Sequence, residues 1–135
     1  MQIFCIEDFK ENIGRLTSKK SYRNIEEDVI EHFFNSKDIQ DLRSGSRLNH
    51  CDDKPYIKKR LKGSGGYRIY YLLLLMDNNV YLMYIHPKTG SMRMDSLSKE
   101  DISALYQKVY HCIENNDLYL VEPSEDKKQL IFTKT

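Results

Sequence analysis

Eight consecutive apolar residues, Ile69 to Met76, dominate the centre of this 135-residue chain. An apolar run without polar alternation is typical of a central strand that is covered on both faces, and this run is too short to cross a membrane as a helix. The strand is predicted to span 67–76. Further strands are predicted at 55–62 and 80–86, joined to it by short polar turns. Together these segments predict an antiparallel meander.

Helical periodicity is found on both sides of the meander. Apolar residues recur at intervals of three or four over 9–16 and 24–35, and again over 98–113. Ser98 fits the N-cap of the last helix, because Asp101 follows it three residues later. The fold class is therefore predicted to be α+β, with two N-terminal helices, a central antiparallel β-meander and a following C-terminal helix.

The remaining segments carry weaker signals. Residues 2–6 alternate weakly, as a short strand would, and 36–53 are polar and predict a loop. Two short apolar runs at 118–121 and 130–132 either pair as a terminal hairpin or dock separately. The chain length and the lack of a linker or repeat predict one domain over 1–135, with a C-terminal extension after about 115.

Positive charge is concentrated in the meander. The net charge of the chain is +1, but residues 54–93 carry +7 while 1–53 and 94–135 carry −3 each. A polyanion responds to the local field rather than to the total charge, so a basic block between acidic ones is a signal for a nucleic-acid or phosphate partner. The alternative is a solvated basic face, and charge alone does not decide between them.

Strand pairing makes this basic block more specific. A turn at 77–79 places Arg68 opposite Pro87 or Lys88, and a turn at 63–66 places Arg60 opposite Arg68 or its neighbour. Arg60, Arg68 and Lys88 are then predicted to form a row on one face. Like charges that face each other destabilise a sheet, so such a row indicates that an anion is normally bound over it.

Further basic side chains extend the row. Alternation places Lys58 and Lys62 on the Arg60 face, and His86 is the nearest group that titrates near neutrality. We therefore take Arg68, Lys88, Arg60, Lys58 and His86 as candidate catalytic residues, and Lys59, Lys62 and Arg93 as candidate RNA-binding residues.

Structural roles are open for several of these residues. Arg68 is alternatively the partner of a carboxylate, because buried charges are usually paired. Lys58, Lys59 and Lys62 are alternatively edge-strand lysines that oppose aggregation. His86 is alternatively a surface histidine without a catalytic role.

The cysteines and histidines do not predict a metal site or a cofactor. Cys5, Cys51 and Cys112 are widely separated, and neither His50-Cys51 nor His111-Cys112 has a second pair at metal-ligand spacing. Scattered, unpaired thiols suit a reducing compartment. Since no signal peptide or membrane-length apolar run is evident, we expect a cytoplasmic protein with no membrane partner.

The meander also carries a family resemblance. The segment Ile57-Lys58-Lys59-Arg60-Leu61-Lys62-Gly63-Ser64-Gly65-Gly66-Tyr67-Arg68-Ile69-Tyr70-Tyr71, followed by Val80–Ile85 and a basic residue at Lys88, resembles the RelE/HigB-type toxins of bacterial toxin–antitoxin systems. The segment from Gly65 to Tyr71 is its most specific part. The resemblance also includes Leu97–Ile102 at the start of a helix.

The resemblance implies a RelE-like fold and an mRNA endoribonuclease (an mRNA interferase) that works without a metal on the ribosome. The ribose 2′-OH attacks the adjacent phosphate and leaves a 2′,3′-cyclic phosphate and a 5′-OH. By position, Arg68 is the phosphate stabiliser, Arg60 and Lys58 lie on the basic strand before it, and Lys88 closes the third strand. The implied partners are a cognate antitoxin, the ribosome and mRNA. Which group is the general base and which the acid stays open.

Two other functions remain possible. One is a ParE-like toxin of the same superfamily, which is not a nuclease and binds a protein target such as gyrase. The other is a non-catalytic nucleic-acid-binding regulator. The density of Lys and Arg over 54–68 favours the ribonuclease, because a gyrase-binding protein does not require a row of phosphate-binding side chains.

Overall fold

The computed structural model describes residues 1–35, 38–61 and 66–135. Along the chain its elements are β1 (Gln2–Cys5), α1 (Glu7–Thr17), η1 (Lys20–Tyr22), α2 (Ile25–Phe34), η2 (Ile39–Leu42), β2 (Ser46–Arg47), β3 (Tyr56–Leu61), β4 (Tyr67–Leu74), β5 (Asn79–Pro87), α3 (Lys99–Glu114), β6 (Tyr119–Pro123) and β7 (Leu130–Lys134). The predicted α+β class is confirmed. The arrangement differs from two helices, a meander and a helix, because the short strand expected at 2–6 and the two terminal runs, which pair as a hairpin, also join the sheet.

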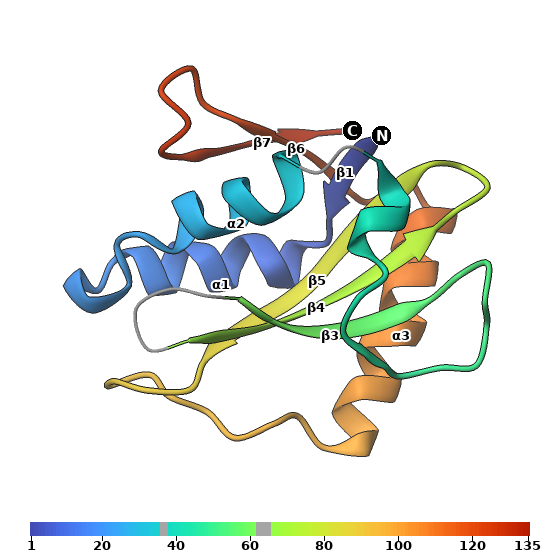
Figure 1. The fold of residues 1–135 in the computed structure, drawn as a ribbon, viewed down its shortest axis with the longest axis horizontal. Coiled ribbons are helices and arrows are strands. Elements are labelled where there is room, and N and C mark those ends of the chain that lie inside the picture. The colour runs from blue at the N-terminus through green and yellow to red at the C-terminus, as the bar shows by residue number, and fades with distance from the viewer. Residues whose placement is uncertain (36–37, 62–65) are drawn as a thin grey trace.

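A seven-stranded sheet in the order β2-β3-β4-β5-β1-β6-β7 forms the centre of the molecule (Figure 1). All neighbouring strands are antiparallel except β1, which pairs with β5 in parallel. The meander β3-β4-β5 is therefore confirmed, and it forms one half of a larger sheet. The two terminal apolar runs pair with each other as β6 and β7, and β6 joins the sheet through β1.

Helices cover both faces of the meander. On one face, α1 and α2 form an apolar core with Ile57, Ile69 and Tyr71. On the other face, α3 packs against a second core that contains Tyr56, Tyr70 and Leu72. Figure 1 shows α3 behind the sheet, on the side away from α1 and α2. This two-sided cover explains why β4 is apolar on both faces.

The N-cap residue and the acidic first turn explain where α3 begins. Ser98 is the N-cap of α3, and its Oγ accepts a hydrogen bond of 3.1 Å from the backbone N–H of Asp101. Glu100 and Asp101 in the first turn complement the positive end of the helix dipole. The helix thus begins where its sequence predicts, and it lies across β3 and β4, where the Tyr56 hydroxyl donates to the carbonyl of Ile102.

The register of β4 and β5 differs from the prediction. Arg68 lies opposite His86, not opposite Pro87 or Lys88. The turn causes the difference. It is formed by residues 75–78, so that Leu74 already pairs with Asn79, and a β-bulge between Tyr70 and Tyr71 then shifts the remaining pairs by one residue, which brings His86 rather than Ile85 opposite Arg68. The register of β3 and β4 agrees with the prediction, since Arg60 lies opposite Arg68.

No helix among the described residues has the length and apolar composition needed to span a membrane. Lys62 and the first three residues of the predicted turn at 63–66 lie outside the described residues.

Candidate nucleic-acid interface

Two transverse rows of side chains share the α3 face of the meander. The first row is Arg60, Arg68 and His86, and the second is Lys58, Tyr70 and Tyr84. Because side chains alternate along a strand, residues two apart on β3, β4 and β5 point to the same side. The predicted row of three cations is thus corrected: a histidine takes the place of Lys88.

Lys88 nevertheless reaches the same site from the segment after β5. Its Nζ lies 3.4 Å from Oγ of Ser96, and Nζ of Lys58 donates to the same oxygen at 2.6 Å. Two ammonium groups therefore converge on one hydroxyl oxygen. Such a pair of donors around a single oxygen is the arrangement that would also bind an oxygen of a phosphate.

The electrostatic environment of Lys58 shows how closely the cations are grouped. Its pKa is lowered, first by burial and then by the positive charges of Lys88 and Arg68. Among the described residues, no salt bridge involves Lys58, Arg68 or Lys88. The alternative that Arg68 serves as the partner of a carboxylate therefore has no support in the described part of the chain.

Gly66 lies beside the two guanidinium groups. A side-chain carbon at this position would lie 3.7 Å from Nε of Arg60 and 3.8 Å from Nη1 of Arg68, so both arginines border the same glycine. The φ angle of Gly66 is +77°, which a residue with a side chain adopts only with strain. The backbone conformation therefore favours glycine here, and the carbonyl of Gly66 accepts a hydrogen bond from the backbone N–H of Lys88.

His86 lies beneath the cations and is not a surface residue, since only 1% of it is exposed. Its Nε2 is 3.2 Å from the hydroxyl of Tyr70, and its Nδ1 is 3.4 Å from the carbonyl of Pro87. Burial lowers the pKa of His86, and the positive charges around it lower this pKa further. The hydrogen bond with the Pro87 carbonyl opposes part of the decrease. A neutral imidazole that is enclosed in this way orients Tyr70 and has no ring nitrogen left for substrate.

Tyr70 connects this buried histidine to the cations. Its hydroxyl accepts from the backbone N–H of Leu97 at 3.4 Å, and Nζ of Lys58 lies 5.9 Å from its ring centroid. The sequence argument missed Tyr70 and Ser96 as parts of the site. The position of Tyr70, two residues after Arg68 on one strand, was the available signal; nothing in the sequence pointed to Ser96.

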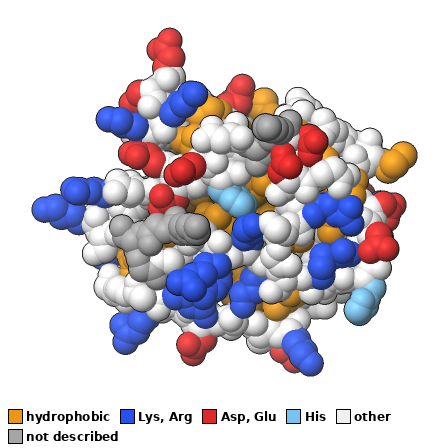
Figure 2. All heavy atoms as spheres, viewed as in Figure 1, with side chains coloured by type: hydrophobic (Ala, Val, Ile, Leu, Met, Phe, Trp, Pro, Cys, Tyr) orange, Lys and Arg blue, Asp and Glu red, His pale blue; other side chains and the backbone are white. Residues whose placement is uncertain are grey.

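Two predicted RNA-binding residues, Lys59 and Arg93, lie away from Lys58, Arg68 and Lys88. Lys59 points to the opposite face of the sheet, where its ammonium group contacts the hydroxyl of Ser44. Arg93 is exposed in the segment after β5, and its guanidinium donates to the carbonyl of Gly90. Figure 2, which views the side away from α3, shows Lys and Arg side chains along the course of β3, so positive charge is present on both sides.

Lys58, Arg60, Arg68 and Lys88 together form a basic cluster on this face of the sheet. Their side chains offer several donors and positive charge, which on the two arginines is permanent, and this is the chemistry that binds and stabilises a phosphate group. In the described part of the chain, no three His, Cys, Asp or Glu side chains are grouped closely enough to hold a metal ion.

No protein-family model matches the chain, and no characterised protein sequence is significantly similar to it.

Proposed function

We propose that this chain is the toxin of a toxin–antitoxin module and that it is an endoribonuclease which cuts mRNA on the ribosome without a metal ion. One observation carries the proposal. Lys58, Arg68 and Lys88 converge on one face of the sheet, and no described carboxylate neutralises them. Uncompensated positive charge of this kind is costly unless an anion occupies the site in function.

The basic cluster supplies the groups that such a cleavage needs. The 2′-oxygen attacks the neighbouring phosphorus, the bond from phosphorus to the 5′-oxygen breaks, and a 2′,3′-cyclic phosphate and a 5′-OH result. Arg68 would bind the phosphate through its planar fork and stabilise the additional charge of the transition state. Arg60, which borders the same glycine, would support it.

Proton transfer is assigned to the two lysines. A general base must be unprotonated, and the burial and neighbouring cations that lower the pKa of Lys58 favour its neutral form. Lys58 would therefore accept the proton of the 2′-OH. Lys88, which shares the Ser96 oxygen with it, would donate a proton to the leaving 5′-oxygen.

His86 has a positioning role in this scheme. Both its ring nitrogens face protein atoms, so it holds the Tyr70 hydroxyl in place. Tyr70 in turn forms the surface over which Lys58 lies.

The proposal is tested by expressing the chain in bacteria and by incubating the purified protein with ribosomes that carry a defined mRNA. We expect growth arrest and cleavage of the ribosome-bound mRNA, with products that end in a 2′,3′-cyclic phosphate and begin with a 5′-OH. Growth arrest with intact mRNA and blocked DNA replication would instead identify a protein-binding toxin. RNA binding without cleavage or arrest would identify a regulator. A cognate antitoxin should abolish the arrest when it is co-expressed.

A further inference from the structure

The hydroxyl of Ser96 is the point on which two cations of the basic cluster converge. Its Oγ accepts a hydrogen bond of 2.6 Å from Nζ of Lys58 and lies 3.4 Å from Nζ of Lys88. The charges of Lys88 and Arg68 also act on Lys58, so these three cations lie within electrostatic reach of one another. A hydroxyl oxygen accepts hydrogen bonds without bringing a negative charge. The cluster therefore keeps its positive charge while Ser96 is unmodified.

We propose that Ser96 is a phosphorylation site, and that its phosphate group occupies the basic cluster and switches the chain off. The switch rests on the proposed function, since it regulates the same cluster. The partner is a protein serine kinase that uses ATP. The Ser96 oxygen attacks the γ-phosphorus, the bond from this phosphorus to the β–γ bridging oxygen breaks, ADP leaves, and the hydroxyl proton passes to the base of the kinase.

Ser96 is accessible to such a partner. Its side chain is exposed, and residues 93–98 form neither helix nor strand, so a kinase can bind them without breaking a helix or a sheet. Arg93, three residues before the serine, is exposed as well. Its guanidinium offers a cation to a kinase with an acidic substrate groove.

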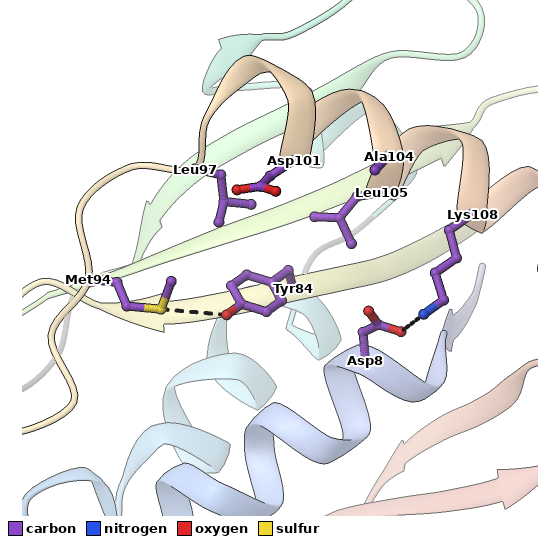
Figure 3. A pocket seen from close by; sticks show the side chains of 8 residues that line it. All are labelled: Asp8, Tyr84, Met94, Leu97, Asp101, Ala104, Leu105 and Lys108. Atoms are coloured by element: carbon purple, nitrogen blue, oxygen red, sulfur yellow. Dashed lines mark hydrogen bonds and ion pairs between the residues drawn. The ribbon is translucent and has the colours of Figure 1, made fainter.

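Contacts on both sides of Ser96 hold it beside the cluster. Two residues before it, Sδ of Met94 accepts a hydrogen bond of 3.5 Å from the hydroxyl of Tyr84. Directly after it, the N–H of Leu97 donates to the hydroxyl of Tyr70 at 3.4 Å. Tyr84, Met94 and Leu97 line one cavity of about 410 Å³, in which Figure 3 shows the contact between Tyr84 and Met94. A phosphate on Ser96 would thus be held where the two ammonium groups meet.

Phosphoserine matches the cluster in charge and in hydrogen bonding. It carries about −1.5 to −2 charges at pH 7 and three strong acceptor oxygens. Lys58 and Lys88 would donate to it, and its charge would offset the repulsion between Arg60 and Arg68, which lie opposite each other. Because this phosphate is attached to the chain, its effective concentration at the cluster is high, and an RNA phosphate would have to displace it.

The first experiment tests the modification itself. The full chain is incubated with ATP that carries a labelled γ-phosphate and with a purified serine kinase that prefers basic substrates. Mass spectrometry then identifies the labelled residues. We expect label on Ser96, no label at this position in Ser96→Ala, and unchanged labelling of Ser96 in Ser91→Ala. A wild-type chain without label on Ser96 overturns the proposal.

The second experiment tests whether the phosphate occupies the cluster. Phosphoserine is incorporated during translation at position 96 or, as a matched control, at position 91, which is exposed in the preceding turn. Phosphorus NMR should show that the second pKa of phosphoserine 96 is well below its usual value of about 6, because the lysines favour the doubly charged form. Phosphoserine 91 should keep the usual pKa. Equal pKa values at the two positions overturn the proposal.

Two substitutions of equal size provide a test that does not depend on phosphoserine. Ser96→Asp places a carboxylate beside the lysines, and Ser96→Asn places a neutral amide there. We expect Ser96→Asp to melt at a higher temperature than Ser96→Asn and to bind inorganic phosphate at least tenfold more weakly. Identical melting temperatures and identical phosphate binding would contradict a phosphate group held by the cluster.

Cleavage of ribosome-bound mRNA separates this inference from the proposed function. Phosphoserine 96 should slow cleavage at least a hundredfold, and phosphoserine 91 should leave it within a few-fold. If the chain with phosphoserine 96 cuts as fast as the unmodified chain, the inference is overturned and the ribonuclease stands. If no form of the chain cuts RNA, while phosphoserine 96 still has the lowered pKa and prevents phosphate binding, the proposed function is overturned and the modified site stands.

Discussion

The hydroxyl of Tyr70 lies 3.2 Å from Nε2 of His86, and this contact is the middle link of a buried hydrogen-bond chain. The chain runs from the N–H of Leu97 through Tyr70 and His86 to the carbonyl of Pro87. With His86 neutral and its proton on Nδ1, Nδ1–H donates to the Pro87 carbonyl and Nε2 accepts from the tyrosine. Protonation of His86 would remove this acceptor for the Tyr70 hydroxyl proton and would add a charge where the nearby cations oppose it.

The buried histidines predict that the protein loses stability in weak acid. Burial lowers the pKa of His86, and burial together with the charge of Lys59 lowers the pKa of His32 from 6.5 to about 4. Below pH 6.5 the unfolded chain takes up protons that the folded chain does not, so a fall in pH favours unfolding. The stability is fully present above 6.5 and decreases as the pH falls toward the folded pKa values.

Urea denaturation at pH 7.5 and 5.5 measures this effect. His32 should account for a loss of about 1 kcal/mol between these two values, and His86 should add to the loss in the same direction. The quantity compared is the difference in the free energy of unfolding between pH 7.5 and pH 5.5. A variant that is equally less stable at both pH values does not change this difference. The double variant His86→Gln, His32→Gln should show little difference, and a wild-type protein with equal stability at both values would contradict the assignment.

Lys58 and Lys59 form a natural pair for mutagenesis, because they are adjacent in sequence and point to opposite faces of β3. Lys58→Ala should lower mRNA cleavage about a hundredfold or more, since it removes the proposed general base. Lys59→Ala should leave cleavage within a few-fold, because Lys59 contacts Ser44 on the other side of the sheet. The measurement is the single-turnover cleavage rate on ribosome-bound mRNA. Equal losses in both variants would indicate general charge attraction rather than a defined site.

Chelation tests the metal-free mechanism. Cleavage should continue when the protein is treated with EDTA and the excess chelator is then removed before ribosomes are added, because ribosomes themselves need magnesium. The treated and untreated proteins should cut at the same rate. A loss of activity that a transition metal restores, without any change in the ribosomes, would show that the cleavage depends on a metal ion.

The sequence predicts the elements of the centre well because each carries a strong local signal. The apolar stripe over 24–35 and the Ser98 cap each produce the structure expected of them. The apolar run forms β4, but the strand ends at Leu74, and the last two residues of the predicted strand 67–76 belong to the turn. What the sequence does not predict depends on long-range packing. The short strand expected at 2–6 forms as β1, but its place between β5 and β6, where Ile3 and Cys5 are buried, has no local signal.

The sequence predicts which charged residues belong to the candidate site, but it does not predict how they are arranged. Arg60 lies opposite Arg68 because the first register follows from pairing rules. The β-bulge after Tyr70 has no sequence signal, and it moves His86 into the row where Lys88 was expected. Lys88 and Ser96 come together through an irregular segment after β5, whose course no periodic pattern encodes.

Arg68 gives the most direct test of the site. Arg68→Ala should lower the cleavage rate about a hundredfold or more, because a charged stabiliser of a phosphoryl transition state contributes roughly 3 kcal/mol. Arg68→Lys should also be poor, since an ammonium group does not reproduce the two parallel hydrogen bonds of a guanidinium. The melting temperature should stay near that of the wild type in both variants. The side chain is half-buried, and within the described residues it forms no ion pair that the substitution would break.

A structural role for Arg68 predicts the opposite combination of results. If the arginine mainly stabilised the fold, the variant would melt at a lower temperature and would still cut RNA at the wild-type rate below that transition. Measuring both quantities on one preparation therefore distinguishes the two roles. The repulsion between Arg60 and Arg68 allows a further test of stability, because the two arginines lie directly opposite each other. Removing one of two facing cations reduces their repulsion, so Arg68→Ala should unfold at the same or a slightly higher urea concentration while its activity is lost.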